Sequence, residues 1–293
     1  MENIYNNTTF LTESSDYENF PEFQYYMKVR FIIRVVTYII ISIGLPLDLV
    51  AIYALYSLVR KDHVAPIYVI NLLISDLIQF CCMIALESQH IHGIAYEIVY
   101  YFYCCGLVAS VCFMMCVSLE RYLVVTHPLW YRFKRTIKTS VIVCVVVWVI
   151  SPICCLIVCP WVDSKVPEII FSVFLIIPLP LFIFCLVGTL RALSASVSVP
   201  SEEKRRIVGI LVLVLLTYTL LFLPSIISYQ AEGMLDNSCY IVSLVFVRLS
   251  PLADLVLYFL IRKDAIGQFL ASVCCCKIES NDNNTSTVNV DNI

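Results

Sequence analysis

The chain has 293 residues, of which 60% are hydrophobic and 14% are charged, and its formal net charge is −3. Soluble domains are typically about 45–50% apolar and about 25% charged, so this composition excludes an ordinary soluble enzyme and a disordered chain. The slightly negative charge also argues against a surface that binds nucleic acid. The composition is that of an integral membrane protein.

Seven apolar runs are long enough to cross a bilayer as helices. A crossing needs about 20 apolar residues, and runs of this length without alternation of period two exclude a β-barrel. We therefore predict an all-α membrane protein, a bundle of seven transmembrane helices. The predicted spans lie near 31–59, 66–89, 97–126, 138–160, 166–191, 205–230 and 239–261.

The remaining residues divide into two tails and a short helix. Residues 1–30 form an amino-terminal tail, 31–261 the bundle, 262–276 a short amphipathic eighth helix and 277–293 a second tail. The triplet Cys274, Cys275 and Cys276 follows the last span, where palmitoylation would hold the eighth helix against the bilayer.

The distribution of basic residues predicts the orientation, because cytoplasmic connections carry an excess of Lys and Arg. One set of connections holds only Lys28, Arg30, Arg34 and Lys165. The other set holds Arg60, Lys61, Arg132, Lys134, Arg135, Lys138, Arg191, Lys204, Arg205, Arg206, Arg262, Lys263 and Lys277. We therefore expect a plasma-membrane protein with an extracellular amino terminus and a cytoplasmic carboxyl terminus. Glycosylation sequons at Asn6 and Asn7 fall on the predicted outer side.

Three carboxylates lie in the middle of predicted spans: Asp48, Asp76 and Asp254. Ionisable groups at membrane depth are costly, and three of them would repel one another. Such a cluster either binds a cation or keeps one or more protons, and Ser110 and Ser250 are candidate helpers. The structural alternative is that water and hydroxyl groups satisfy the carboxyl groups.

Several motifs occur in a fixed order along the spans. The third span ends in Glu120-Arg121-Tyr122, followed by His127-Pro128-Leu129. The other motif residues are Asn71 to Leu77 around Asp76, Trp148, Pro180, Pro224, Asp254 and Tyr258. With these residues the chain resembles the rhodopsin-like (class A) G-protein-coupled receptors over all seven spans. The nearest branch includes the proton-sensing, nucleotide and lipid-mediator receptors.

The resemblance implies a receptor that binds an extracellular ligand and activates a heterotrimeric G protein by outward movement of the sixth helix. It assigns coupling and switching to Glu120, Arg121, Tyr122, Pro224, Phe222 and Tyr258. It assigns a sodium site to Asp76, Ser110, Ser250 and Asp254, with Asp48 as a further charge that favours sodium or a shared proton. Arrestin is a further implied partner, and no other cofactor or metal is implied.

The chain departs from the family pattern at five positions. Asp48 replaces the usual Asn, Phe222 the sixth-helix Trp, Gly188 the fifth-helix Tyr and Leu255 the seventh-helix Pro. Tyr96 stands where the family has the third-helix Cys of its extracellular disulfide. These departures keep two alternatives open, a receptor-like scaffold with impaired signalling and an ion channel or transporter.

The ligand-binding candidates lie toward the predicted outer end of the spans. Arg248 is about two turns outside Asp254, where it either receives an anionic ligand group or pairs with Glu87. Tyr100, Tyr103 and Tyr229 are expected to line the same cavity. A small anion, a lipid mediator or a proton would suit these residues. We expect no enzymatic activity, because the sequence offers no nucleophile–base pair and no set of His and Cys at metal-ligand spacing.

Overall fold

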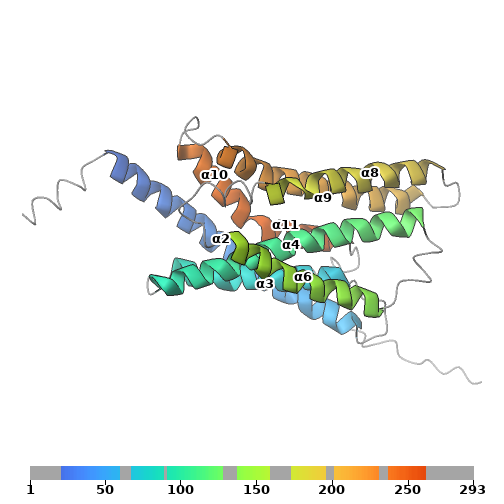
Figure 1. The fold of residues 1–293 in the computed structure, drawn as a ribbon, viewed down its shortest axis with the longest axis horizontal. Coiled ribbons are helices and arrows are strands. Elements are labelled where there is room, and N and C mark those ends of the chain that lie inside the picture. Colours follow the sequence, from blue (N-terminus) through green and yellow to red (C-terminus); the bar gives the residue numbers. More distant parts are fainter. Residues whose placement is uncertain are drawn as a thin grey trace, which may run out of the picture.

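A computed structural model of the chain describes residues 21–59, 67–88, 91–127, 137–158, 173–195, 201–230 and 237–261. These residues are almost entirely helical. Their helices are α2 (Pro21–Val59), α3 (Ile67–Glu87), α4 (Ile94–Thr126), α6 (Ile137–Val158), α8 (Pro178–Ala195), α9 (Ser201–Gln230), α10 (Asn237–Arg248) and α11 (Ser250–Ile261). In Figure 1 the helices α4, α6, α8 and α9 run along the long axis of the bundle, α2 and α10 run obliquely to it, and the amino-terminal part of α2 extends beyond it.

Within the described residues, six helical segments are long and apolar enough to cross a membrane, and α11 contributes a shorter apolar helix. This arrangement confirms the predicted all-α membrane bundle. Helix α2 begins at Pro21 rather than near residue 31, and its apolar stretch begins at Met27. The predicted eighth helix, 262–276, lies outside the described residues.

The predicted seventh span consists of two helices rather than one. Helix α10 ends at Arg248 and α11 begins at Ser250. Leu249 lies in a turn, where its N–H donates to the carbonyl oxygens of Val245 and Phe246, both at 3.1 Å. Pro251 explains the break, because it lacks the N–H that a helix requires and its ring collides with the preceding turn.

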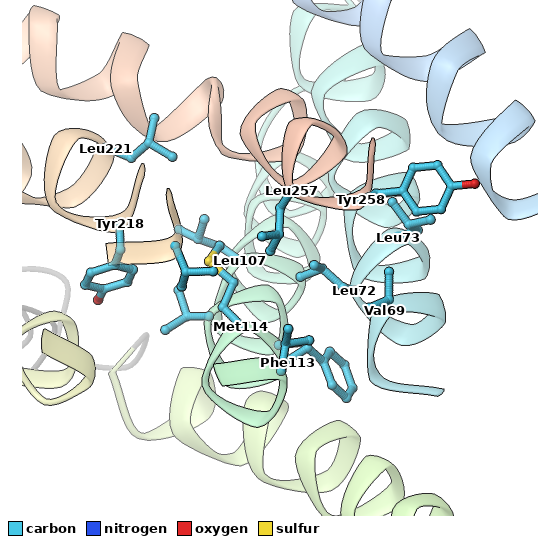
Figure 2. Packing of buried hydrophobic residues seen from close by; sticks show 14 of the residues in the cluster. Val69, Leu72, Leu73, Leu107, Phe113, Met114, Tyr218, Leu221, Leu257 and Tyr258 are labelled. Carbon is cyan, nitrogen blue, oxygen red and sulfur yellow. The ribbon is translucent and has the colours of Figure 1, made fainter. Parts of the chain in front are cut away.

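Helix α4 lies at the centre of the bundle. In its apolar stretch 67% of the residues are buried, against 28% in α6, whose outer face exposes residues such as Ile142 and Ile153. Side chains from α3, α4, α9 and α11 meet in the main apolar cluster, where Leu72, Met114 and Leu257 lie between the helices (Figure 2). Burial of this kind, with apolar side chains also on the outside, is what a helical bundle in lipid requires.

Two glycines allow close approach between helices. A Cβ atom at Gly44 in α2 would overlap the ring of Phe80 in α3. A Cβ atom at Gly106 in α4 would lie 3.0 Å from Cγ of Gln79 and 3.2 Å from the carbonyl oxygen of Ser75. Both contacts bring neighbouring helices toward α3, the helix that carries Asp76.

Gly44→Ala is expected to destabilise the bundle, because the added methyl group displaces the Phe80 ring from a packed site at a cost of about 1–3 kcal/mol. Gly209→Ala in α9 is the matched control, because a Cβ atom there meets nothing within 4 Å. Ala is favoured over Gly in a helix by about 0.5–1 kcal/mol, so the control should unfold at a slightly higher temperature. Thermal unfolding of both variants in the same nanodiscs measures the difference. Equal shifts in the two variants would contradict the close contact at Gly44.

Candidate functional site

The three intramembrane carboxylates come together from three helices. Asp48 in α2, Asp76 in α3 and Asp254 in α11 are each at most 1% exposed. Their charges are close enough to interact. We call these three residues the carboxylate centre. It lies inside the bundle, where all three side chains are buried.

Hydroxyl and amide groups satisfy part of this centre. Ser110 in α4 donates from Oγ to Oδ2 of Asp254 at 2.7 Å. Gln79 donates from Nε2 to Oδ1 of Asp76 at 3.3 Å, and Ser250 donates from Oγ to Oε1 of Gln79 at 3.4 Å. The hydrogen bonds therefore join α3, α4 and α11, and both predicted helper serines take part.

Asp48 differs from the other two carboxylates. Neither of its side-chain oxygen atoms has a hydrogen-bond partner among the described residues, although the side chain is fully buried. A buried carboxylate without a donor is costly, and a cation or a proton at this place would remove the cost. The geometry of Asp48 therefore fits either of the two predicted occupants.

Gln79 is a residue of this site that was not predicted from the sequence. It is fully buried, and it contacts both Asp76 and Ser250. Its position three residues after Asp76 places both side chains on the same side of α3. A polar residue at that spacing within an apolar run is the signal that could have identified it.

A second group of charged side chains lies in the first half of α2 and at the ends of α3 and α10. Arg248 donates from Nη1 to both Oε1 of Glu87 and Oγ1 of Thr37. Nε of Arg34 lies 3.4 Å from Oε2 of the same Glu87. We call Arg34, Thr37, Glu87 and Arg248 the ionic cluster. Of the two roles open to Arg248, the structure contains the internal pair with Glu87.

Arg34 is the unexpected member of the ionic cluster. From the sequence it counts among the basic residues of the outer connections, because it lies near the start of the first predicted span. In the structure it lies inside α2, one turn before Thr37, whose hydroxyl donates to the carbonyl oxygen of Ile33 at 2.8 Å. Position near the end of an apolar run does not distinguish a solvated Arg from one that faces the bundle.

The three candidate tyrosines do not share one environment. Tyr103 in α4 is buried and packs with Ile40, Phe80 and Met83. Tyr100 is 48% exposed, and its ring centroid is 6.4 Å from that of Tyr103. The side chain of Tyr229 lies outside the described residues. The structure thus brings Tyr103, but not Tyr100, into the layer next to the ionic cluster.

Three of the predicted coupling residues lie near the end of α4. Glu120 is buried, and Arg121 and Tyr122 are half-buried. The ring of Tyr122 packs against Phe184 in α8, with centroids 5.3 Å apart. A Cβ atom on Gly188 would lie 3.2 Å from Cδ2 of Tyr122 and closer still to its Cε2 atom. Tyr122 therefore occupies the space that a larger residue at Gly188 would need.

Phe222, one of the two predicted switch residues of α9, belongs to an aromatic stack. Phe222 is fully buried against Tyr218, with ring centroids 4.7 Å apart, and Tyr218 packs on Phe182 of α8 at 5.1 Å. The Tyr218 hydroxyl donates to the carbonyl oxygen of Leu175 at 2.6 Å. Tyr218 and Phe182 were not among the predicted site residues, and together with Phe222 they join α9 to the α8 segment.

Other predicted positions lie in the described part without reaching these groups, or lie outside it. Pro224 is inside α9, and Tyr258 is buried in α11 beside Leu73 (Figure 2). Trp148 donates from Nε1 to Oδ1 of Asn71 at 2.9 Å, which joins α6 to α3. Asn6, Asn7 and the cysteines 274–276 lie outside the described residues.

This arrangement, apolar helices of membrane-crossing length with buried charges between them, is that of a multi-pass membrane protein, and comparison with known proteins indicates the family that it resembles. The sequence profile described as "7 transmembrane receptor (rhodopsin family)" matches residues 48–168. Over this stretch the chain is similar to the rhodopsin-like, class A family of G-protein-coupled receptors. Family members are ligand-activated receptors that couple to G proteins and are not enzymes.

The relatives of the chain are distant. It is 25% identical to proteinase-activated receptor 2 of Rattus norvegicus, in an alignment that covers 86% of this chain and 74% of that receptor. It is 24% identical to Mas-related G-protein coupled receptor member A6 of Mus musculus, covering 80% of this chain and 85% of the relative. It is 26% identical to the type-1 angiotensin II receptor of Oryctolagus cuniculus, but over only 39% of this chain and 33% of that receptor.

Gly188→Ala is expected to destabilise the bundle by about 1–3 kcal/mol, because the methyl group collides with the Tyr122 ring. The same substitution in a Tyr122→Ala background should cost little, since the ring is then absent. Thermal unfolding of the wild type, both single variants and the double variant gives the coupling energy between the two positions. A coupling energy of zero would contradict the packing of Tyr122 on α8.

Proposed function

We propose that this chain is a plasma-membrane receptor with an extracellular amino terminus and a cytoplasmic carboxyl terminus. In this proposal an extracellular ligand binds at the outer end of the bundle, and α9, the sixth spanning helix, then moves outward to admit a heterotrimeric G protein. The excess of Lys and Arg on one set of connections supports the orientation. Coupling to a G protein follows from the family, whereas the route through the bundle is inferred from the contacts.

The observation that carries the proposal is the carboxylate centre. Its members and their donors come from α2, α3, α4 and α11. A change in the protonation or cation content of this centre alters the repulsion between helices, so the centre can favour one of two packings. Three buried carboxyl groups, of which Asp48 and Asp76 keep oxygen atoms without a donor among the described residues, are better explained by a switch than by stability alone.

The outer end can act on this centre through the broken seventh span. Arg248 is the last residue of α10, and Leu249 forms the break before Ser250. A ligand that changes the contacts of Arg248 therefore shifts Leu249 and Ser250, the residues at which α11 begins. Since Ser250 and Asp254 both lie on α11, this shift reaches the carboxylate centre within about one turn of helix.

At the inner end, Arg121 is proposed to contact the G protein and Glu120 to hold it at rest. Pro224 removes one backbone hydrogen bond from α9 and so supplies a bend for its outward movement. Tyr218 transmits the movement between α8 and α9, because its ring contacts both Phe222 of α9 and Phe182 of α8. Glycosylation at Asn6 and Asn7, palmitoylation at Cys274, Cys275 and Cys276, and arrestin binding complete the proposal from the sequence.

Arg121→Ala is expected to reduce G-protein activation at least tenfold, because the proposed contact to the G protein is lost. The measurement is nucleotide exchange on a panel of purified G proteins with receptor reconstituted in nanodiscs. Arg191→Ala in α8, an exposed arginine near the same end, is the control and should retain activity. Equal activity in wild type and Arg121→Ala would contradict the proposed role. Ion flux without any G protein would instead favour the channel or transporter.

Asp48→Asn is expected to change how basal nucleotide exchange responds to sodium or to pH, because Asp48 is the carboxylate without a protein donor among the described residues. If the centre holds sodium, replacing potassium with sodium alters exchange in the wild type and has a smaller effect in the variant. If it shares a proton, the variant loses the pH dependence. Ser42→Ala, an exposed hydroxyl on the same helix, is the control. Unchanged dependence on both ions would exclude both occupants.

A further inference from the structure

The ionic cluster contains one more positive charge than negative. Among the described residues, Glu87 is the only acid paired with Arg34 or Arg248. Both guanidinium groups therefore share one carboxylate, and the cluster carries a net charge of about +1. A surplus charge between helices is expensive unless an anion neutralises it.

The guanidinium groups still have donors to offer. Each carries five N–H groups, but within the described residues Arg248 uses only Nη1 and Arg34 contacts Glu87 only through Nε. The side chains of Arg34 and Arg248 are 29% and 23% exposed, whereas Glu87 is 11% exposed. The arginines are thus more accessible than the acid that they share.

A layer of apolar side chains borders the ionic cluster on the side toward the carboxylate centre. One turn further into α2 and α3, the side chains of Ile40, Phe80 and Met83 pack together with Tyr103 of α4. They bury their surfaces almost completely, so little water reaches the guanidinium groups from that side. Charge-assisted hydrogen bonds are stronger where water is excluded.

We infer that Arg34 and Arg248 together form a docking site for an anionic ligand group, a carboxylate or a phosphate, and that this group competes with Glu87 for the two guanidiniums. The inference rests on the proposed receptor function and assigns the chemistry of its ligand. In the absence of ligand, the Glu87 carboxylate pairs with the two guanidinium groups in place of the ligand. Arg248 ends α10, so its transfer from Glu87 to the ligand is the event that moves the seventh span.

Inorganic pyrophosphate is a suitable probe, because it carries several negative oxygen atoms on a small frame. Purified receptor in phosphatidylcholine nanodiscs is unfolded thermally at increasing pyrophosphate, with chloride replacing it at constant ionic strength. The unfolding temperature of the wild type should rise and saturate, as expected for a ligand of the folded state. The absence of any rise beyond that in chloride would overturn the inference.

Variants of the ionic cluster are expected to change the affinity for pyrophosphate in opposite directions. Arg34→Gln and Arg248→Gln should each raise the half-saturating pyrophosphate concentration at least tenfold, since each removes a charged donor. Glu87→Gln should lower it several-fold, because the competing carboxylate is gone. Loss of pyrophosphate binding in Glu87→Gln would overturn the proposed competition. If either Gln variant does not fold, Arg34→Lys and Arg248→Lys keep the charge, and each should bind more weakly than the wild type.

Arg30→Gln is the matched control. Arg30 lies one turn before Arg34 on α2, is exposed, and its substitution changes the net charge by the same amount. Its pyrophosphate response should equal that of the wild type, and an effect as large as that of Arg248→Gln would overturn the site in favour of general charge attraction.

A variant with Glu13, Asp16 and Glu18 neutralised separates a soluble anion from acidic residues of the chain itself. Binding unchanged by it indicates a soluble ligand, and tighter binding indicates that these residues normally occupy the site. Both results support the docking site and differ only in the source of its anion.

The same preparations test the proposed function separately through nucleotide exchange on G proteins. A receptor that couples but does not bind pyrophosphate contradicts only the anion site. A receptor that binds pyrophosphate but couples to no G protein contradicts only the receptor mechanism.

Discussion

A carboxyl group removed from water must obtain a proton, a cation or hydrogen-bond donors, and this bundle buries three such groups together. Ser110 and Gln79 supply donors to Asp254 and Asp76, whereas Asp48 has none among the described residues. The helices that carry these groups can pack closely only while the negative charge between them is neutralised or hydrogen-bonded. The carboxylate centre therefore limits which arrangements of α2, α3 and α11 are stable, and the functional proposals depend on that limit.

Several departures from the family pattern are matched by a compensating feature nearby. Leu255 removes the usual seventh-helix proline, but Pro251, four residues earlier, breaks the same span about one turn away. Gly188 removes a fifth-helix side chain, and the Tyr122 ring occupies the adjoining space. Phe222 replaces a larger indole and stacks on Tyr218, which is anchored to Leu175. Such compensation favours a working receptor over a scaffold that has lost its switch.

The sequence predicts some parts of this molecule well, and the physical reasons are specific. Long apolar runs identify the spans, and Asp76 or Asp254 within such a run is conspicuous, because charge in lipid is rare. The pairing of charged side chains is harder to predict from the sequence. Whether Arg248 meets Glu87 or a ligand depends on the rotation and tilt of three helices, which residue spacing does not determine. From the sequence Arg34 was assigned to an outer connection rather than to the bundle, because the ends of an apolar run are not sharply defined. The break at Leu249 follows from Pro251, but one proline inside a span produces either a bend or a break, depending on the neighbouring helices.

The ionic cluster and the carboxylate centre are separated by a layer of apolar side chains. Ile40, Phe80, Met83 and Tyr103 lie between the ionic cluster and the carboxylate centre, and these four side chains are almost wholly buried. Coupling between the two groups is therefore best carried by helices that belong to both, namely α2, α3 and the α10–α11 pair. Because such coupling is reciprocal, an occupant of the carboxylate centre that favours one packing must also change the affinity of the ionic cluster for its ligand. In the proposed mechanism, a change of charge at the ionic cluster therefore alters the packing of the helices around the carboxylate centre.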